Sequence, residues 1–295
     1  MREEEKFIKS YDGELIYAKE YLVENPKGTI ILTTDLKEHA LLYENFAKYF
    51  ANLNFNVFTY DLRAHKNSAK EPFGTYSNNF FNDCVRDLLY LNKYLNKKYE
   101  TKTINIAVGF GSVVLTRMLQ FYDENTINVL IGTPFEKFNI RNYFYRIFTR
   151  LTLVFVNKNS EAKFINKLIN YSNMRKYEDG AFESTNKEYI EKIRNDKFCN
   201  FNLSANILNS IYKGYIDTFN IKNINKISKN HKFFLTTGEF DKITKFGKST
   251  HNLAIKLAKV NINSEKVVFN NLRHNLINEN DFTFYKYLED FMGEN

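Results

Sequence analysis

The stretch TINIAVGFGSVV, at residues 103–114, decides the fold of this chain. A β-branched, apolar run ends in Gly109-Phe110-Gly111, and helix-forming residues follow immediately. This order predicts a strand that turns directly into a helix through closely spaced glycines. Such a turn is typical of three kinds of site: the nucleophile turn G-x-S-x-G, the dinucleotide loop G-x-G-x-x-G and the phosphate loop. The remainder of the chain discriminates among them.

Apolar runs alternate with helix-spaced patterns on both sides of this stretch. Buried strands are predicted at 29–34 and 55–61 before it and at 127–132 after it, with a long amphipathic helix at 78–95. This alternation predicts an α/β fold with a mostly parallel, doubly wound sheet. The other predicted elements are a strand pair at 6–9 and 14–23, strands at 232–237 and 266–269, and helices at 41–50, 113–122, 250–257 and 282–292.

The alternation stops at Thr133-Pro134. From residue 135 to about 228 the pattern is helical and rich in aromatic residues, and no clear strand appears before 232–237. A helical block between two strands of one sheet is typical of a cap. We therefore expect a core of residues 1–134 and 230–295 and a helical cap of residues 135–229.

Composition narrows the class of protein. A chain of 295 residues, 43% hydrophobic, suffices for one large α/β core with a smaller insert. The net charge of +8 comes from lysines spread along the chain, which favours a solvated basic surface, and no nucleic-acid-binding signature is present. The acidic start MREEEKF lacks an apolar signal region, and no window holds 18 uninterrupted apolar residues. We expect a cytoplasmic protein, with any peripheral contact at the inner membrane face.

Two of the three turn types fit the sequence poorly. The tripeptide GKS at 247–249 resembles the end of a phosphate loop, but the first glycine of that motif would have to stand at Lys242. A dinucleotide loop beginning at Gly109 would need its third glycine at Val114, where close contact of helix and strand requires it. The nucleophile turn is favoured, and no cofactor or metal is expected.

Three other segments support the nucleophile turn. Residues 33–68, TTDLKEHALLYENFAKYFANLNFNVFTYDLRAHKNS, are similar to HGxxEH…Y…AxxL…G(Y/F)xVxxxDxRGHGxS, residues 238–243 to G-x-x-D-x-(I/V), and residues 271–279 to an HxxxNE-type segment. In this order the motifs resemble the α/β-hydrolase superfamily, and within it the monoacylglycerol lipase and lysophospholipase group of serine aminopeptidase S33-type hydrolases. The matched residues of the first segment are Glu38, His39, Tyr43, Asp61, Arg63, His65 and Ser68.

The resemblance implies an α/β-hydrolase fold with a helical cap, and carboxylic-ester hydrolysis of monoacyl lipids. It assigns Asp241 as the acid and His274 as the base of a catalytic triad. In such enzymes a serine on the sharp turn attacks the ester carbonyl, histidine takes its proton and a carboxylate fixes the histidine tautomer.

The nucleophile position departs from the family pattern. Alignment places Gly111 there, and a glycine has no side chain to attack with. Ser112 is the alternative nucleophile, but its neighbours two positions away are Phe and Val, whereas the tight turn needs small residues. The oxyanion donors implied are the N–H groups of Leu36 and Ser112. The expected His-Gly of the oxyanion loop is Thr34-Asp35, which brings a carboxylate beside the site.

The predicted cap begins with an aromatic and basic segment, residues 142–156. Arg146 and Arg150 interleave with aromatic residues, which on a helix gives a basic edge beside an apolar face. This face either packs on the core or faces a lipid. The lipid-facing residues predicted are Tyr143, Phe144 and Phe148.

Three functional hypotheses follow. The first is a degenerate hydrolase that binds an acyl lipid or other apolar ester while ordinary serine catalysis is lost. The second is an esterase or lysophospholipase that uses Ser112 with His274 and Asp241, or a water activated by that pair. The third is a non-catalytic module whose cap contacts a protein partner or a membrane.

Overall fold

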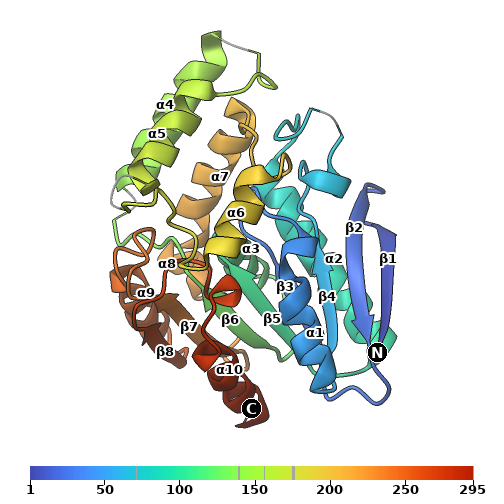
Figure 1. The fold of residues 1–295 in the computed structure, drawn as a ribbon. Coiled ribbons are helices and arrows are strands. Elements are labelled where there is room, and N and C mark those ends of the chain that lie inside the picture. Colours follow the sequence, from blue (N-terminus) through green and yellow to red (C-terminus); the bar gives the residue numbers. More distant parts are fainter. Residues whose placement is uncertain (71, 139, 156, 175–176, 295) are drawn as a thin grey trace.

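An eight-stranded sheet forms the centre of the molecule in this computed structural model, which describes residues 1–70, 72–138, 140–155, 157–174 and 177–294 (Figure 1). The strand order is β1-β2-β4-β3-β5-β6-β7-β8. Strands β3 to β8 run parallel, and β1 and β2 add an antiparallel edge. The strands are β1 Arg2–Lys9, β2 Leu15–Leu22, β3 Thr29–Thr33, β4 Asn56–Tyr60, β5 Thr103–Val108, β6 Ile127–Ile131, β7 Lys232–Gly238 and β8 Ser264–Phe269.

Helices cover both faces of the sheet, because its central strands are apolar on both sides. Every residue of β3, β4, β5 and β6 is buried. Helices α1 (Glu44–Asn52) and α10 (Thr283–Glu294) share one hydrophobic cluster with the sheet, and α2 (Phe80–Tyr99), α3 (Phe110–Met118) and α9 (Lys248–Ala258) share the other. The predicted α/β class and its mostly parallel, doubly wound sheet are therefore confirmed.

In the described part of the chain between β6 and β7 there are five helices, and Figure 1 shows α4 and α5 on the outer side of α7, away from the sheet. The rings of Tyr145 on α4 and Tyr212 on α7 stack with centroids 5.0 Å apart. Val156, in the predicted cap segment, lies outside the described residues. The five are α4 Ile140–Phe155, α5 Lys163–Met174, α6 Lys187–Asn195, α7 Ala205–Thr218 and α8 Ile221–Ile224. Among the described residues, no helix is both long and apolar enough to cross a bilayer.

Helix α3 begins at Phe110, three residues before the predicted start at 113. The strand β5 therefore ends at Val108 and one residue, Gly109, makes the whole connection. This early start determines which side chain stands at the turn.

Candidate active site

Gly109 makes the bend between β5 and α3. Its backbone angles, φ 50° and ψ −115°, lie in a region that strains residues with a side chain. The motif alignment predicts Gly111 at this position, and the structure corrects the register by two residues. Gly111 lies in the first turn of α3, where an added Cβ would come within 2.6 Å of the carbonyl oxygen of Thr34. A glycine is needed there because the helix approaches the end of β3 closely.

Ser112 is fully buried and turned toward the backbone. Its hydroxyl donates to the carbonyl oxygen of Gly109 at 2.5 Å, and its N–H donates to the same oxygen at 3.1 Å. Both donors of Ser112 are thus used inside the first turn of α3. This geometry contradicts Ser112 as the nucleophile and Ser112 as an oxyanion donor.

Asp241 and His274 come from the loops after β7 and β8 and meet in a buried pair. His274 Nδ1 lies 2.9 Å from Asp241 Oδ2. Asp241 also accepts hydrogen bonds from the Thr237 hydroxyl at 2.7 Å and the Ile243 N–H at 2.8 Å, so its carboxylate is held in place. Gly132 leaves room for the imidazole, because an added Cβ would lie 2.5 Å from His274 Cε1. The other imidazole nitrogen, Nε2, faces the Asp35 carboxylate.

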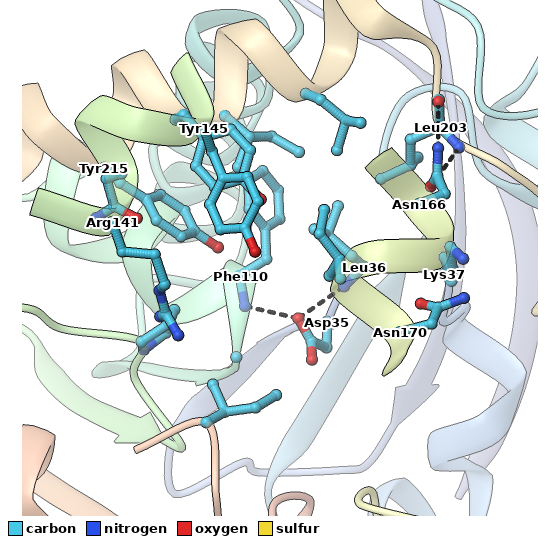
Figure 2. Close-up of a pocket in the computed structure, with 18 of the residues that line it drawn as sticks. Asp35, Leu36, Lys37, Phe110, Arg141, Tyr145, Asn166, Asn170, Leu203 and Tyr215 are labelled. Atoms are coloured by element: carbon cyan, nitrogen blue, oxygen red, sulfur yellow. Dashed lines mark hydrogen bonds between the residues drawn. The ribbon is translucent and has the colours of Figure 1, made fainter. Parts of the chain in front are cut away.

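The Asp35 carboxylate occupies the space in front of Gly109. Figure 2 shows this carboxylate hydrogen-bonded to the backbone of Phe110 and of Leu36. Its Oδ1 accepts hydrogen bonds from the N–H groups of Phe110 at 2.6 Å and Leu36 at 2.8 Å. Its Oδ2 lies 3.2 Å from His274 Nε2. A Cβ added to Gly109 would be 2.3 Å from Asp35 Cγ. The carboxylate therefore fills the volume that a side chain at the bend would need.

A cavity of about 180 Å³ opens over this group between the sheet and helices α4, α5 and α7. An engineered cavity of about 150 Å³ holds benzene, so this one has room for a ring or a short chain. Helix α4 contributes Arg141, Asn142 and Tyr145 to its wall. The predicted lipid-facing set differs: Tyr143 and Phe144 are 49% and 62% exposed. The apolar lining comes from Ile169, Leu203, Leu208, Ile211, Tyr212, Tyr215 and Ile243.

A family model described as serine aminopeptidase, S33, matches residues 24–281. The chain belongs to this family. Its fold is the α/β-hydrolase fold: a thermostable carboxyl esterase from Bacillus coagulans in complex with glycerol is similar over 100% of this chain and 99% of its own, with a TM-score of 0.87 and 15% identity. A monoglyceride lipase from Saccharomyces cerevisiae in complex with a substrate analogue has a TM-score of 0.71 and 13% identity, over 99% and 94% of the two chains. None of the curated protein sequences matches the chain.

The monoacylglycerol lipase from Paleococcus ferrophilus is also similar, with a TM-score of 0.67 and 15% identity over 94% of this chain and 97% of that chain. At such low identities the likeness shows the fold alone. Family membership nevertheless predicts what kind of side chain the bend should carry. In serine hydrolases a nucleophile on such a strand-to-helix turn faces histidine, beside two backbone N–H groups that stabilise an oxyanion. This S33 chain presents glycine at that turn and a carboxylate from another loop in the same space.

The charges around His274 favour its protonated form. Burial alone would lower the pKa of the imidazole, but the carboxylates of Asp241 and Asp35 outweigh burial and raise this pKa well above its usual range. Burial also opposes ionisation of Asp241, yet the charge and hydrogen bond of His274 hold the pKa of that carboxyl below its usual value. An imidazolium between two carboxylates is the state that the structure supports.

Replacing Asp35 by asparagine is expected to lower the pKa of His274, because one of the two negative charges beside the ring disappears. The folded pKa of His274 exceeds the unfolded value of about 6.5, so its stabilising contribution is complete below about pH 6.5 and is lost as pH rises through the folded pKa. In Asp35→Asn the loss should still begin near pH 6.5 but should be smaller and complete at a lower pH. NMR titration of the imidazole and urea unfolding across pH measure both effects.

The exposed carboxylate of Asp290 provides a matched control. Asp290→Asn should leave the His274 titration where it is in the parent chain. An unchanged His274 titration in Asp35→Asn would contradict the ion pair.

Glu38 holds the loop that carries Asp35. Its Oε2 accepts the Asp35 N–H at 3.2 Å and also a short hydrogen bond from the Tyr43 hydroxyl. Its Oε1 accepts from the Tyr189 hydroxyl at 2.7 Å and from Asn275 Nδ2 at 2.9 Å. Tyr189 lies on α6 and Asn275 follows His274, so one carboxylate ties the loop after β3 to both the inserted helices and the histidine loop.

The other motif histidines have structural contacts. His65 Nε2 accepts the Lys37 N–H at 3.0 Å, and its Nδ1 lies 2.8 Å from the Arg63 carbonyl oxygen. His39 Nε2 lies 2.9 Å from Asp196 Oδ2. Burial lowers the pKa of both rings to about 4, so they are neutral at physiological pH.

One group of described residues brings three possible metal ligands together. Atoms of His39, Asp196 and Cys199 lie within 4.8 Å of one another. The Lys66 ammonium is 3.3 Å from His39 Nδ1, however. A metal cation would therefore meet a positive charge, and this group fits a hydrogen-bonded cluster better than a metal site.

Sequence reasoning missed the contacts of Asp35 and the donor role of Phe110. The departure of Asp35 from the family pattern was visible, and so was the glycine two residues before Gly111. An alignment of G-x-S-x-G beginning at Ala107 would have placed Gly109 at the nucleophile position. The sequence therefore contains the signal for Gly109. Gly111 also fits the glycine pattern, however, and only the residue at which α3 begins decides between the two.

Proposed function

We propose that this S33 chain binds a small apolar ester or acyl ligand in the cavity above Asp35, and that ordinary serine catalysis is lost. The observation that carries the proposal is that the bend holds no nucleophilic side chain. Gly109 offers no nucleophile, and the Asp35 carboxylate fills both the space in front of it and the pair of N–H donors. A substrate carbonyl cannot use donors that already hold a carboxylate oxygen.

The shape of the cavity supports an apolar ligand. Most of its lining residues are aliphatic or aromatic, as is typical of ligand sites. Polar groups come from the loops at its base and from α4 and α5: Asp35, Lys37, Arg141, Asn142, Asn166, Asn170 and His274. The related structures of a carboxyl esterase with glycerol and of a monoglyceride lipase with a substrate analogue agree with an ester-like ligand. In this proposal residues 135–229 form the cap and the remainder of the chain forms the core, with His274 and Asp241 retained in the triad positions.

A fluorophosphonate probe and a ligand titration test this function together. The parent chain is expected to show no serine labelling, because Ser112 is buried and turned to the backbone.

A fluorescent short-chain acyl ester should bind to the parent chain. Ile211→Trp fills the cavity and should weaken this binding at least ~10-fold, since the cavity has little spare volume. Ile255→Trp, on the exposed side of α9, is the matched control. Labelling of Ser112, or equal binding by both variants, would refute the proposal.

A second candidate function, peripheral membrane contact, is favoured by the outer face of α4. Ile147, Leu151, Val154 and Phe155 are 55–84% exposed and repeat at helical spacing. Together with Ile140, Tyr143 and Phe144 they define what we term the outer face of α4. Exposed cations lie on α4 itself at Arg150 and shortly after it in the chain at Lys158, Lys163 and Lys167. Soluble proteins rarely expose so large an apolar face, and exposed basic residues suit an anionic lipid surface such as the inner membrane face.

Co-sedimentation with vesicles of phosphatidylglycerol and phosphatidylcholine tests this contact. Replacing Ile147 and Leu151 by serine should reduce the bound fraction several-fold, because less apolar area enters the interface. A control variant carries the same change at Ile221, which is exposed far from α4 in the chain. Sedimentation that is equal for all three proteins would contradict membrane contact through α4.

A further inference from the structure

A second cavity, of about 230 Å³, lies beside the loop that carries Asp35. Its wall combines this loop with residues from the segments 180–183, before α6, and 193–200, at and after the end of α6. None of the described residues of α4 or α7 lines it, although both helices line the first cavity. The second cavity is therefore a different space, which shares only part of its wall with the first.

The side chain of Lys37 faces this second cavity. Lys37 lines both cavities, but the two titratable groups whose charges act on its ammonium, Glu183 and Cys199, line only the second. The backbone of Lys37 is fixed, because its φ is 62° and its N–H donates to His65 Nε2 at 3.0 Å. Among the described residues, Nζ has no hydrogen bond and no ion pair. The amine is therefore available to a ligand.

The cavity favours uncharged forms of both Lys37 and Glu183. Burial lowers the pKa of the Lys37 ammonium, and the negative charge of Glu183 opposes this only in part. Burial raises the pKa of Glu183 to about 7. The two groups do not form an ion pair, so space remains between them. A neutral amine is a nucleophile and a neutral carboxyl group is a proton donor, which together suit addition to a carbonyl group.

The lining selects a small, neutral carbonyl compound. Asp35 and Glu38 also line the cavity, so a ligand with a carboxylate would meet negative charge. Leu36, Phe182 and Ile193 supply apolar surface. An aldehyde fits better than a ketone, because its carbonyl carbon is less hindered and more electrophilic.

The cation among the lining residues does not change this preference. Arg194 is exposed, and its Nη2 donates to the Asp179 carbonyl oxygen at 2.5 Å. Its charge is thus solvated and already directed to another acceptor.

We propose that Lys37 binds small, neutral aldehydes as an imine and that Glu183 transfers the protons of this reaction. The proposal goes beyond the ester site above Asp35. It uses a different cavity and a nitrogen nucleophile, so the lack of a serine at the bend does not affect it.

The first step forms a bond between nitrogen and carbon. The lone pair of Lys37 Nζ attacks the aldehyde carbon, and the electron pair of the C=O double bond moves to the oxygen. This oxygen takes the proton of the Glu183 carboxyl group. The nitrogen, now positively charged, returns a proton to the Glu183 carboxylate. The product is a neutral carbinolamine beside a neutral Glu183.

The second step expels water. The carbinolamine hydroxyl takes the proton of Glu183 and leaves as water, while the nitrogen lone pair forms the C=N double bond. One amine and one aldehyde thus give one protonated imine and one water, and the charge of the imine is balanced by the Glu183 carboxylate. Addition of water in the reverse order releases the aldehyde.

Benzaldehyde with sodium cyanoborohydride tests this site on the full chain. A cavity of about 150 Å³ holds a benzene ring, so the aldehyde fits the second cavity. The reductant converts the imine to a stable amine, and peptide mapping locates the benzyl group. At neutral pH the peptide that contains Lys37 should carry at least ~10-fold more benzyl groups than any other lysine peptide, because solvated lysines remain protonated.

Matched variants test each part of the site. Lys37→Met should abolish the preferred labelling, and Lys167→Met, at an exposed lysine of α5, should leave it unchanged. Glu183→Gln should slow trapping at Lys37 at least ~10-fold, because the proton donor is lost. Ile193→Trp fills the second cavity and should reduce the labelling several-fold. Ile211→Trp, in the wall of the first cavity only, should not reduce it.

Three results would overturn the proposal: benzyl groups spread evenly over the lysines of the parent chain, trapping at the parent rate in Glu183→Gln, or undiminished labelling of Lys37 in Ile193→Trp. Binding of the fluorescent acyl ester is measured on the same preparation. Ester binding without preferred labelling of Lys37 would reject the aldehyde site alone. Preferred labelling of Lys37 without ester binding would support the aldehyde site and reject the proposed function.

Discussion

A chain carrying both Asp35→Gly and Gly109→Ser is expected to react with a fluorophosphonate probe at residue 109 and to hydrolyse short-chain esters at least ~10²-fold faster than the parent chain. The glycine at position 35 removes the carboxylate and frees the N–H groups of Leu36 and Phe110. The serine then stands at the bend, facing His274, which Asp241 already orients. Mass mapping of the labelled peptide and ester turnover measure the gain.

The single substitutions test separately the need for a serine at the bend and the need to remove the Asp35 carboxylate. Gly109→Ser alone should stay unreactive and lose about 1–3 kcal/mol of stability, because its Cβ would lie 2.3 Å from Asp35 Cγ in a strained backbone conformation. Asp35→Gly alone should stay unreactive for lack of a nucleophile. A Gly111→Ser variant serves as the register control and should not label. Labelling at 111 in preference to 109 would show that the bend is not at Gly109.

The replacement Arg63→Met is expected to lower the free energy of unfolding by about 3–5 kcal/mol, because it leaves the buried Asp87 carboxylate without its partner. Arg63 Nε donates to Asp87 Oδ2 at 2.5 Å and Nη2 donates to Oδ1 at 2.6 Å, a two-pronged pair in which both side chains are 2% exposed. The same guanidinium binds Asp12 and the Tyr76 hydroxyl. It thereby ties the first loop to the segment after β4. Urea unfolding measures the loss.

The double variant Arg63→Met with Asp87→Leu tests the cause. It should recover a large part of the lost stability, because no unpaired charge remains in the core. Equal losses in the single and double variants would show that packing around Arg63, and not the charge pair, sets the cost.

The elements of the fold were predictable because each has a local signal. Continuous apolar runs marked β3, β4, β5 and β6, since strands covered on both faces need apolar residues throughout. The prediction for α3 was three residues late at its start. Phe110, Gly111 and Ser112 are poor helix formers by propensity, and α3 includes them because tertiary packing places Phe110 in the core beside Phe80 and Phe81.

This error at the start of α3 moved the predicted nucleophile position from Gly109 to Gly111. The motif residues Asp241 and His274 could be identified because their local patterns are distinctive. The contact between them, and the occupant of the space before Gly109, carry no local signal.

By itself the sequence determined the order of strands and helices, the family, and a glycine-rich turn without a serine at its centre. These depend on hydrophobic spacing and short motifs, which act within a few residues. Only the tertiary structure decided that Asp35 meets His274, 239 residues away along the chain, and that one carboxylate takes the place of a missing side chain. The physical reason is that the ends of parallel strands gather distant loops at one edge of the sheet, where a pairing depends on atomic fit.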